Sequence, residues 1–316
     1  MTKLNIIKPT ALHRGDVIGI ISPASPVSSD EKIEKGVQYL EQLGYRVKLG
    51  KHVRDTHGYL AGTDLHRAHD INSMFNDKQV KAIFCMRGGY GSPRLLPFIN
   101  YKLIKQNPKI FVGYSDITAL QLAIFKKTNL VTFSGPMVGV EMWNSFDSTT
   151  EGIFWTMLLS TKKFGILNRE ALNKTLPIRR GRETGIILGG NTSLIASICG
   201  TQFLPSFKDS ILFLEEVDEQ NYRLDRLLNQ ISLNNVFEDS KGIVIGQLTD
   251  IMQKDLTQPF LTVEEILDGY FGKLKKPVLT NFSYGHVPKK YTLPFGITAR
   301  IDSGKNQIEI LEGAVS

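Results

Sequence analysis

A serine stands where an apolar segment runs directly into a predicted helix. Residues 109–122 read KIFVGYSDITALQL, which predicts a strand, a tight turn at Ser115 and a helix from Ile117. Such a turn projects the hydroxyl from the carboxyl edge of a sheet, next to free helix N–H groups that could stabilise an oxyanion. The pattern resembles the G-x-S-x-G turn of a nucleophile, but Ile117 replaces the second glycine. The alternative is that Ser115 simply caps the helix.

A glycine-rich loop follows another apolar strand. Residues 86–91 read MRGGYG, and glycines at the carboxyl end of a strand let the backbone approach a ligand closely. Gly88 or Gly89 could therefore supply a second N–H group to an oxyanion. A dinucleotide-binding loop does not fit, because Arg94 stands where the third glycine belongs and Pro93 interrupts the turn. An ordinary tight turn is the alternative.

An acid and a base follow two further predicted strands. Residues 211–219 read ILFLEEVDE, so the strand ends in Glu215 and Glu216, and His286 follows another strand through Gly285. A glutamate at a strand end could accept a hydrogen bond from a histidine and hold the tautomer that a general base needs. By default, however, acidic residues after a strand are solvated loop residues.

The sequence gives little support for a metal site. His66, His69 and Asp70 share a predicted helix face, but an HxxHD pattern without further ligands is weak and HExxH is absent, which favours surface histidines. Cys85 and Cys199 lie in apolar runs and are expected to be buried free thiols. The remaining histidines outside the strand–Gly–His segment lie in polar loops and carry no signal: His13, His52 and His57.

The first half of the chain alternates strand-like and helix-like segments, which predicts a parallel sheet covered by helices. The expected strands are 16–22, 45–49, 80–86 and 110–113, and the expected helices are 31–43, 65–75 and 117–127. The polar segment near 160–176 is expected to connect two domains. We therefore expect an N-terminal α/β domain over residues 1–160, a linker over 161–175 and a C-terminal domain over 176–316.

The second half is expected to be a mixed, β-rich domain. Its predicted strands are 185–188, 210–214, 242–246, 278–282 and 297–311, the last broken at Ser303-Gly304, and its predicted helices are 191–199 and 222–230. No internal repeat or low-complexity segment interrupts this pattern.

Length, charge and hydropathy narrow the function classes. A chain of 316 residues accommodates two domains. Its start lacks the apolar core of a signal peptide, and no apolar stretch approaches the ~20 residues of a membrane span, so we expect a soluble cytoplasmic protein. The formal charge of +7 is not gathered into long basic runs interleaved with aromatics, so nucleic-acid binding is not expected. A basic balance could also attract an anionic small substrate.

Taken in order, these segments resemble the L,D-carboxypeptidases of murein recycling, the muramoyltetrapeptide carboxypeptidase type of serine peptidase. The resemblance extends from about Leu12 to Ile310. Many collinear matches make it more specific than any single motif. The matching segments are GDVIGIISPASP, YLAGTDLHRAHDIN, MRGGYGSPRLL, VGYSDITAL, SGPM, LGGNTSLI, ILFLEEVDE with YRLDRLLNQ, and NFSYGH with PFG.

The resemblance implies a catalytic triad whose nucleophile is Ser115, whose acid is Glu215 and whose general base is His286. It also implies a flavodoxin- or amidotransferase-like first domain that carries the nucleophile. A β-rich second domain would carry the acid and the base. The protein would act as a homodimer without metal or cofactor.

The resemblance further implies that the backbone N–H groups of Asp116 and of Gly88 or Gly89 hold the oxyanion. The substrate would be a small murein tetrapeptide that ends in diaminopimelate or lysine followed by D-alanine. Because this substrate is anionic, a basic residue could hold its terminal carboxylate. Arg87 is our candidate for that role, and backbone support of its own loop is the alternative.

Two other functions remain open. Some relatives of the carboxypeptidases hydrolyse acylated sulfamoyl adenylates and confer immunity to a peptide-nucleotide antibiotic with the same triad. A non-catalytic α/β binding protein would instead hold a ligand at the same strand ends. Covalent labelling of Ser115 would distinguish an enzyme from a binding protein.

Overall fold

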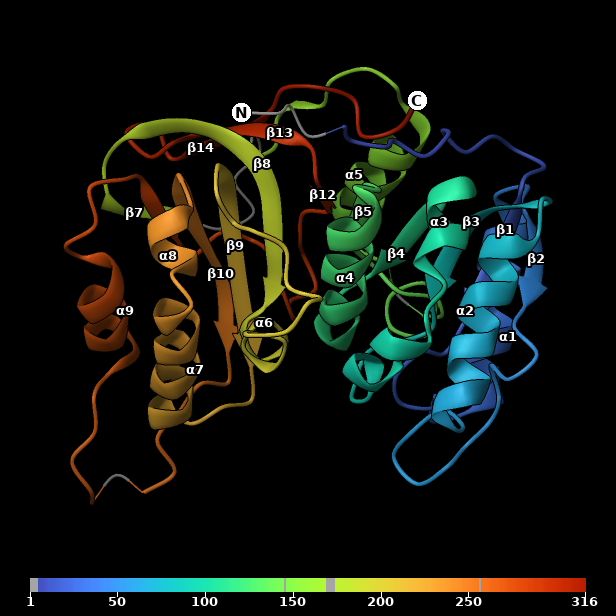
Figure 1. Cartoon of the computed structure of the whole chain (residues 1–316), viewed down its shortest axis with the longest axis horizontal. Helices are drawn as coiled ribbons and strands as arrows, with labels where there is room; N and C mark the ends of the chain where they lie inside the picture. Colours follow the sequence, from blue (N-terminus) through green and yellow to red (C-terminus); the bar gives the residue numbers. More distant parts are fainter. Residues whose placement is uncertain (1–4, 145, 169–173, 256) are drawn as a thin grey trace. The chain divides into compact units, whose positions relative to one another are not determined.

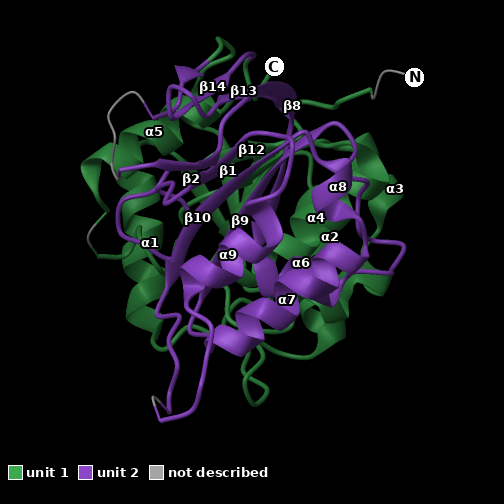
Figure 2. Ribbon diagram, turned by 90° about the vertical axis from the view of Figure 1, so that its left-hand side faces the viewer, with its two compact units in different colours: residues 1–163, 292–296, 313–316 green, residues 164–291, 297–312 purple. Residues whose placement is uncertain are grey.

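The computed structural model describes residues 5–144, 146–168, 174–255 and 257–316, which form two compact units. Unit 1 comprises residues 1–163, 292–296 and 313–316, and unit 2 comprises residues 164–291 and 297–312 (Figure 2). Residues 169–173 of the expected linker over 161–175 lie outside the described residues.

Unit 1 is built on a six-stranded sheet with the order β12-β5-β4-β3-β1-β2 (Figure 1). Neighbouring strands from β1 to β5 pair in parallel, and β12 pairs with β5 antiparallel. The central strands are apolar runs buried on both faces, as helix-covered parallel sheets require. The strands are β1 Val17–Ile21, β2 Arg46–Leu49, β3 Val80–Cys85, β4 Ile110–Gly113, β5 Thr132–Ser134 and β12 Leu293–Phe295.

Helices cover both faces of this sheet. Helices α2, α3 and α4 lie on one face, where α3 contacts both α2 and α4 (Figure 2). The opposite face carries α1 and α5, which are joined by a hydrogen bond from the Tyr39 hydroxyl to Glu151. The helices are α1 Asp30–Gln42, α2 Asp64–Asn76, α3 Tyr101–Gln106, α4 Thr118–Thr128 and α5 Ser148–Leu159, with 3-10 turns η1 Ser92–Phe98 and η2 Ser115–Ile117.

Unit 2 contains an eight-stranded mixed sheet with the order β6-β14-β13-β8-β9-β10-β11-β7. The four strands β8 to β11 are parallel, and the remaining pairs are antiparallel. The strands are β6 Gly165–Ile166, β7 Leu176–Arg179, β8 Arg182–Asn191, β9 Ser210–Val217, β10 Gly242–Thr249, β11 Val278–Thr280, β13 Thr298–Asp302 and β14 Gln307–Ile310. The helices are α6 Thr192–Ser197, α7 Asn221–Leu233, α8 Val236–Asp239 and α9 Val263–Phe271.

These two sheets confirm the predicted fold class, an α/β unit with a parallel-rich sheet followed by a mixed, β-rich unit. The chain also returns to unit 1 twice near its end, through β12 and through residues 313–316, which the sequence analysis did not predict. Both cysteines are free thiols; Cys85 is buried as expected, whereas Cys199 is half-buried. Among the described residues, no helix combines the length and the apolar character needed to cross a bilayer.

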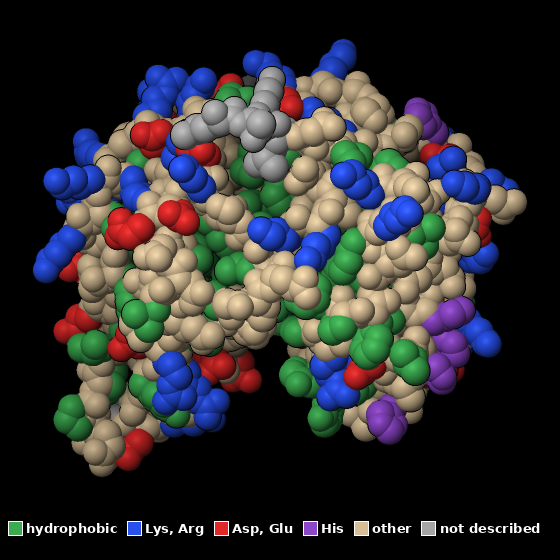
Figure 3. All heavy atoms as spheres, viewed as in Figure 1, with side chains coloured by type: hydrophobic (Ala, Val, Ile, Leu, Met, Phe, Trp, Pro, Cys, Tyr) green, Lys and Arg blue, Asp and Glu red, His purple; other side chains and the backbone are tan. Residues whose placement is uncertain are grey.

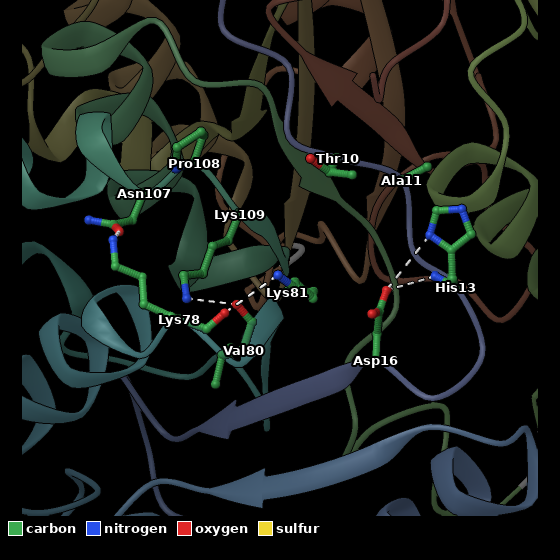
Figure 4. Close-up of a pocket in the computed structure, with 10 residues that line it drawn as sticks. All are labelled: Thr10, Ala11, His13, Asp16, Lys78, Val80, Lys81, Asn107, Pro108 and Lys109. Atoms are coloured by element: carbon green, nitrogen blue, oxygen red, sulfur yellow. Dashed lines mark hydrogen bonds and ion pairs between the residues drawn. The ribbon is translucent and has the colours of Figure 1, made fainter.

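The amino ends of the unit 1 strands border a cavity of about 300 Å³, which Figure 4 shows with its lining residues. Its lining includes the side chains of Lys78, Lys81 and Lys109, and each ammonium group donates a hydrogen bond to a nearby carbonyl or amide oxygen. The ammonium of the buried Lys109 donates to the carbonyl oxygen of Val80 at 2.7 Å and also to that of Asp77. Burial lowers the pKa of Lys109 to about 8.

Candidate active site

Ser115 occupies a strained turn between β4 and the helices that follow. Its φ angle is 62°, a left-handed conformation that is unfavourable for residues other than glycine. The residue begins the 3-10 turn η2, which continues into α4. The N-cap residues are Tyr114 for η2 and Ile117 for α4, so Ser115 does not occupy the capping position that was the alternative for this serine. The side chain is half-buried.

The glycine-rich loop lies directly against this turn. Because β3 and β4 are parallel neighbours, the loops after them meet at the same carboxyl edge of the sheet. A Cβ atom added to Gly88 would lie 2.9 Å from both the Cβ and the Oγ of Ser115, and 3.3 Å from the backbone nitrogen of Asp116. Only a glycine therefore fits at position 88 without a shift of the Ser115 turn.

Asp116 connects the two loops through its side chain. Its carboxylate oxygens accept the backbone N–H of Gly91 at 3.3 Å and that of Ser92 at 2.7 Å. The Ser92 hydroxyl donates in return to the Asp116 carbonyl oxygen. Asp116 is 1% exposed, and this burial raises the pKa of its carboxyl group. Ser115 thus lies between the backbone of Gly88 and the buried Asp116. We call the hydrogen bonds of Asp116 with Gly91 and Ser92 the Asp116 brace.

Gly89 and Arg87 face other parts of unit 1. A Cβ atom at Gly89, whose φ is 113°, would overlap the side chain of Ser25 rather than approach Ser115. The Arg87 guanidinium donates to the carbonyl oxygen of Gly88 at 3.3 Å and to that of Pro26 at 3.4 Å. These contacts favour the alternative that Arg87 supports the backbone of its own loop.

In unit 2, Glu215 and His286 form a hydrogen-bonded pair. Oε2 of Glu215 lies 2.8 Å from Nδ1 of His286. The glutamate side chain is 1% exposed and the histidine side chain 23%. The default alternative for both glutamates, that they are solvated loop residues after the strand, does not hold, because both are buried. Because β8 and β10 continue to pair with β9 on either side, the strand extends to Val217 and buries them both.

Two glycines bring the histidine loop to the glutamate. A Cβ atom at Gly246 of β10 would lie 2.6 Å from the carbonyl oxygen of Tyr284, so the loop passes directly over this glycine. Gly285 has a φ of 115°, and its Cβ position would lie 2.8 Å from Oε2 of Glu215. A side chain at either position would push the loop that carries His286 away from Glu215.

Glu216 serves a different group of partners. Its carboxylate accepts hydrogen bonds from the Asn191 amide at 3.0 Å and from the backbone and hydroxyl of Ser193 at 2.7 Å each. Burial raises the pKa of Glu216. Successive side chains of a strand point to opposite faces, which explains why Glu215 alone of the two bonds to His286.

Each predicted site residue thus falls into one of two groups. Unit 1 gathers Ser115, Asp116, Gly88, Gly89 and Arg87 in adjacent loops, and unit 2 pairs Glu215 with His286. Sequence reasoning missed the side-chain role of Asp116 and the close approach at Gly246. The signal for the first was an acidic residue directly after the serine. The second gave no sequence signal beyond a glycine inside an apolar strand.

Comparison with known families identifies both units. Residues 18–135 match the family model described as LD-carboxypeptidase N-terminal domain, and residues 184–301 match the model of the LD-carboxypeptidase C-terminal domain.

Individual relatives match over almost the full chain. A probable murein peptide carboxypeptidase of Bacillus subtilis is 36% identical and aligns with 98% of this chain and 95% of its own. The microcin C7 self-immunity protein MccF of Escherichia coli is 31% identical, with 96% and 95% covered.

Solved structures show the same fold. The MccF-like protein of Bacillus anthracis has a TM-score of 0.84 at 33% identity, with 97% of this chain and 99% of that chain covered. A muramoyltetrapeptide carboxypeptidase of Oxalobacter formigenes has a TM-score of 0.81 at 26% identity, with 93% and 97% covered.

Proposed function

Because the chain belongs to the LD-carboxypeptidase family of peptidases, family S66, we propose that it is a serine carboxypeptidase that releases the terminal D-alanine from murein tetrapeptides in cell-wall recycling. Ser115 is the proposed nucleophile, His286 the general base and Glu215 the acid that orients it. The observation that carries this proposal is the 2.8 Å hydrogen bond between Glu215 and Nδ1 of His286.

That hydrogen bond defines the direction of proton transfer. A carboxylate can only accept, so Nδ1 carries a proton and Nε2 is the nitrogen that acts as a base. Glu215 is buried beside the ring and supports the imidazolium that forms when Nε2 takes a proton. This is the role that a triad acid has on unrelated folds.

The proposed reaction begins when the Ser115 hydroxyl attacks the carbonyl carbon before D-alanine and loses its proton to Nε2 of His286. The backbone N–H groups of Asp116 and Gly88 stabilise the oxyanion; one such donor lowers the activation barrier by about 3–4 kcal/mol. Gly88 is favoured over Gly89 because its backbone lies against Ser115. The imidazolium then protonates the leaving amine, D-alanine departs, and water hydrolyses the ester on Ser115.

The strained backbone at Ser115 supports this role. Left-handed conformations of residues other than glycine persist where the surrounding structure fixes them, and they gather at functional sites. Here Gly88 and the Asp116 brace fix the turn. A cytoplasmic location, a homodimer and action without metal or cofactor are further parts of the proposal. Arg87 is our candidate for binding the substrate carboxylate. Its hydrogen bonds to the carbonyl oxygens of Gly88 and Pro26 favour the alternative, in which it supports the backbone of its own loop.

The first experiment measures D-alanine release from a murein tetrapeptide by the wild type, Ser115→Ala and Ser197→Ala. Ser197 is an exposed serine on α6 and serves as the matched control. We expect release by the wild type and the control, and its loss in Ser115→Ala with unchanged folding. Release that survives in Ser115→Ala would remove this serine as the nucleophile.

A second candidate function follows from the similarity to the microcin self-immunity protein. In that case the same residues would hydrolyse an acylated sulfamoyl adenylate. Offering both substrates to the purified protein separates the two functions. Labelling of Ser115 by a fluorophosphonate, with neither substrate cleaved, would indicate an activated serine and a different acyl substrate. Absence of labelling would favour a non-catalytic binding protein.

A further inference from the structure

Three histidines and two aspartates gather in unit 1 beside the N-terminal half of α2. The sequence analysis placed His66, His69 and Asp70 on one helix face and gave no weight to His52. The structure brings His52 and Asp55, from the connection between β2 and α2, to that face. Figure 3 shows histidine side chains collected at the side of the molecule where Figure 1 places α2.

The tightest part of this cluster is the group His52, Asp55 and His66. Nδ1 of His52 lies 2.9 Å from Oδ2 of Asp55, and Nδ1 of His66 lies 2.8 Å from the same oxygen. The two imidazole rings stack with their centroids 4.0 Å apart. Two ring nitrogens therefore meet one carboxylate oxygen, and the three possible ligand atoms all lie within 4.8 Å of one another.

The backbone holds two of these residues in place. The N–H of His52 donates to Oδ2 of Asp70 at 2.8 Å, and Asp70 is buried. His66 lies in the first turn of α2, whose N-cap residue Thr63 accepts the His66 N–H at 3.2 Å. The fold thus fixes the backbone of both histidines, and their side chains and that of Asp55 can adjust around an ion.

The chemistry of this set selects one class of cation. Imidazole nitrogen with a single carboxylate suits Zn²⁺ and similar transition-metal ions, whereas Ca²⁺ and Mg²⁺ require mainly oxygen ligands. Zinc binds nitrogen at about 2.0–2.1 Å, so tetrahedral ligand atoms lie about 3.3 Å apart. Each ring nitrogen would move from 2.8–2.9 Å to about 3.3 Å from the Asp55 oxygen. The stacked rings, inclined by 18°, would also turn so that both planes meet at the ion. Asp55 is 35% exposed and His66 46%, which leaves them room to move.

We propose that His52, Asp55 and His66 bind one divalent transition-metal ion of the Zn²⁺ class, with water completing the coordination. The ion would fasten the β2–α2 connection to the start of α2. Leu60 of the same connection and Arg67 of α2 both approach Gly91 in the glycine-rich loop. The bound ion would therefore restrict the motion of Leu60 and Arg67, which pack against the glycine-rich loop. It would take no part in the proposed reaction, and the inference does not depend on that reaction.

A second possible ligand group shares His52. It consists of His52, His69 and Asp70. Asp70 already accepts the His52 N–H, and its Oδ1 lies at a longer distance of 3.4 Å from Nδ1 of His69. Because Asp70 serves the backbone, we assign the ion to the group that contains Asp55.

The test is Zn²⁺ binding by the chain without an affinity tag, measured by isothermal titration and by metal analysis after dialysis. We expect one Zn²⁺ per chain in the wild type. His66→Ala and Asp55→Asn should each weaken binding by about 10–100-fold or more. His57→Ala is the matched control, because His57 is an exposed histidine of the same connection outside the cluster, and it should bind as the wild type does.

A second readout is the midpoint of thermal unfolding. Zn²⁺ should raise the midpoint of the wild type and of His57→Ala but not that of His66→Ala, since a ligand that binds the folded state stabilises it. Without zinc, the midpoint of His66→Ala shows whether that variant is folded. The inference is overturned if the wild type binds no more Zn²⁺ than His52→Ala/His66→Ala does. It is also overturned if His69→Ala weakens binding as much as His66→Ala, which would assign the ion to the second group.

Discussion

The Ser115 turn of unit 1 and the Glu215–His286 pair of unit 2 are held in place by different means. Around Ser115 the backbone provides the geometry, through a left-handed residue, a close glycine and the N–H groups that the Asp116 carboxylate accepts. In unit 2 a side-chain hydrogen bond provides it, between a buried strand carboxylate and a histidine on a loop. Substitutions that remove a charge should therefore lower the activity mainly when they are made in unit 2. Substitutions that add side-chain volume should lower the activity in both units.

Glu215→Gln is expected to have the largest effect of the charge changes. An amide that takes the place of the carboxylate can bind the wrong tautomer of His286 and cannot support an imidazolium. A comparable exchange in a serine protease triad lowers kcat by about 10⁴-fold. We expect a fall of about 10³–10⁴-fold in the kcat for D-alanine release, with little change in the KM.

The matched control is the neighbouring Glu216→Gln. Glu216 is equally buried but bonds to Asn191 and Ser193 rather than to His286. It should lower the free energy of unfolding, by about 1–3 kcal/mol for the disturbed buried hydrogen bonds, and leave most of the activity. Equal losses of kcat in the two variants would contradict the assignment of Glu215.

Shape changes test the two regions together. At Gly88→Ala the added Cβ would lie 2.9 Å from Ser115 Oγ, and at Gly285→Ala it would lie 2.8 Å from Glu215 Oε2. A displacement of about 1 Å at a reacting group can cost about 10²-fold in rate, so we expect losses of this size in both variants. Gly285→Ala should also lower the midpoint of thermal unfolding, because a φ of 115° strains any other residue.

Gly152→Ala provides the control for these substitutions. Gly152 lies inside α5, and a Cβ atom there would have no neighbour within 4 Å. The substitution should preserve activity and raise stability slightly, since alanine favours a helix. Wild-type kinetics in Gly88→Ala would show that the glycine-rich loop does not position the nucleophile.

The sequence predicted well those features that depend on local patterns. The apolar run before Ser115 specifies β4, and the periodicity after it specifies α4, so the strand-to-helix turn was predictable. The order of strands and helices was also sufficient to predict a parallel sheet, whose carboxyl edge collects the loops that carry Ser115 and Gly88.

Features that depend on distant pairing were not predictable in this way. Glu215 and Glu216 look like loop residues in the sequence, and they are buried only because β8 and β10 extend beside them. The return of β12 to pair with β5 depends on residues about 160 positions apart in the chain, such as Leu293 and Ser134. The approach of His52 to His66 likewise follows from the path of a connection that has no periodic pattern.

Asp116→Asn should have a smaller effect than the glycine substitutions. Both carboxylate oxygens accept backbone N–H groups, those of Gly91 and Ser92, and an asparagine must direct its NH₂ group at one of them. One buried donor then loses its acceptor, which costs about 1–3 kcal/mol of folding free energy. We expect a lower midpoint of thermal unfolding. The fall in kcat should be only about tenfold, because Gly88 still packs against Ser115 in this variant. Unchanged stability would show that this brace contributes little.

Lys109→Met tests the opposite, amino-terminal edge of the unit 1 sheet, and should leave kcat unchanged. The pKa of Lys109 is lowered from 10.5 to about 8 by burial. Between those pH values the unfolded chain holds a proton that the folded chain has released, so the free energy of unfolding increases as pH rises. Denaturant titrations should therefore show the wild type gaining stability relative to Lys109→Met from about pH 8 to 10.5. A flat difference would contradict the lowered pKa. A fall in kcat would show that the two edges of the sheet are coupled, so that the Ser115 turn depends on more than the loops that contact it.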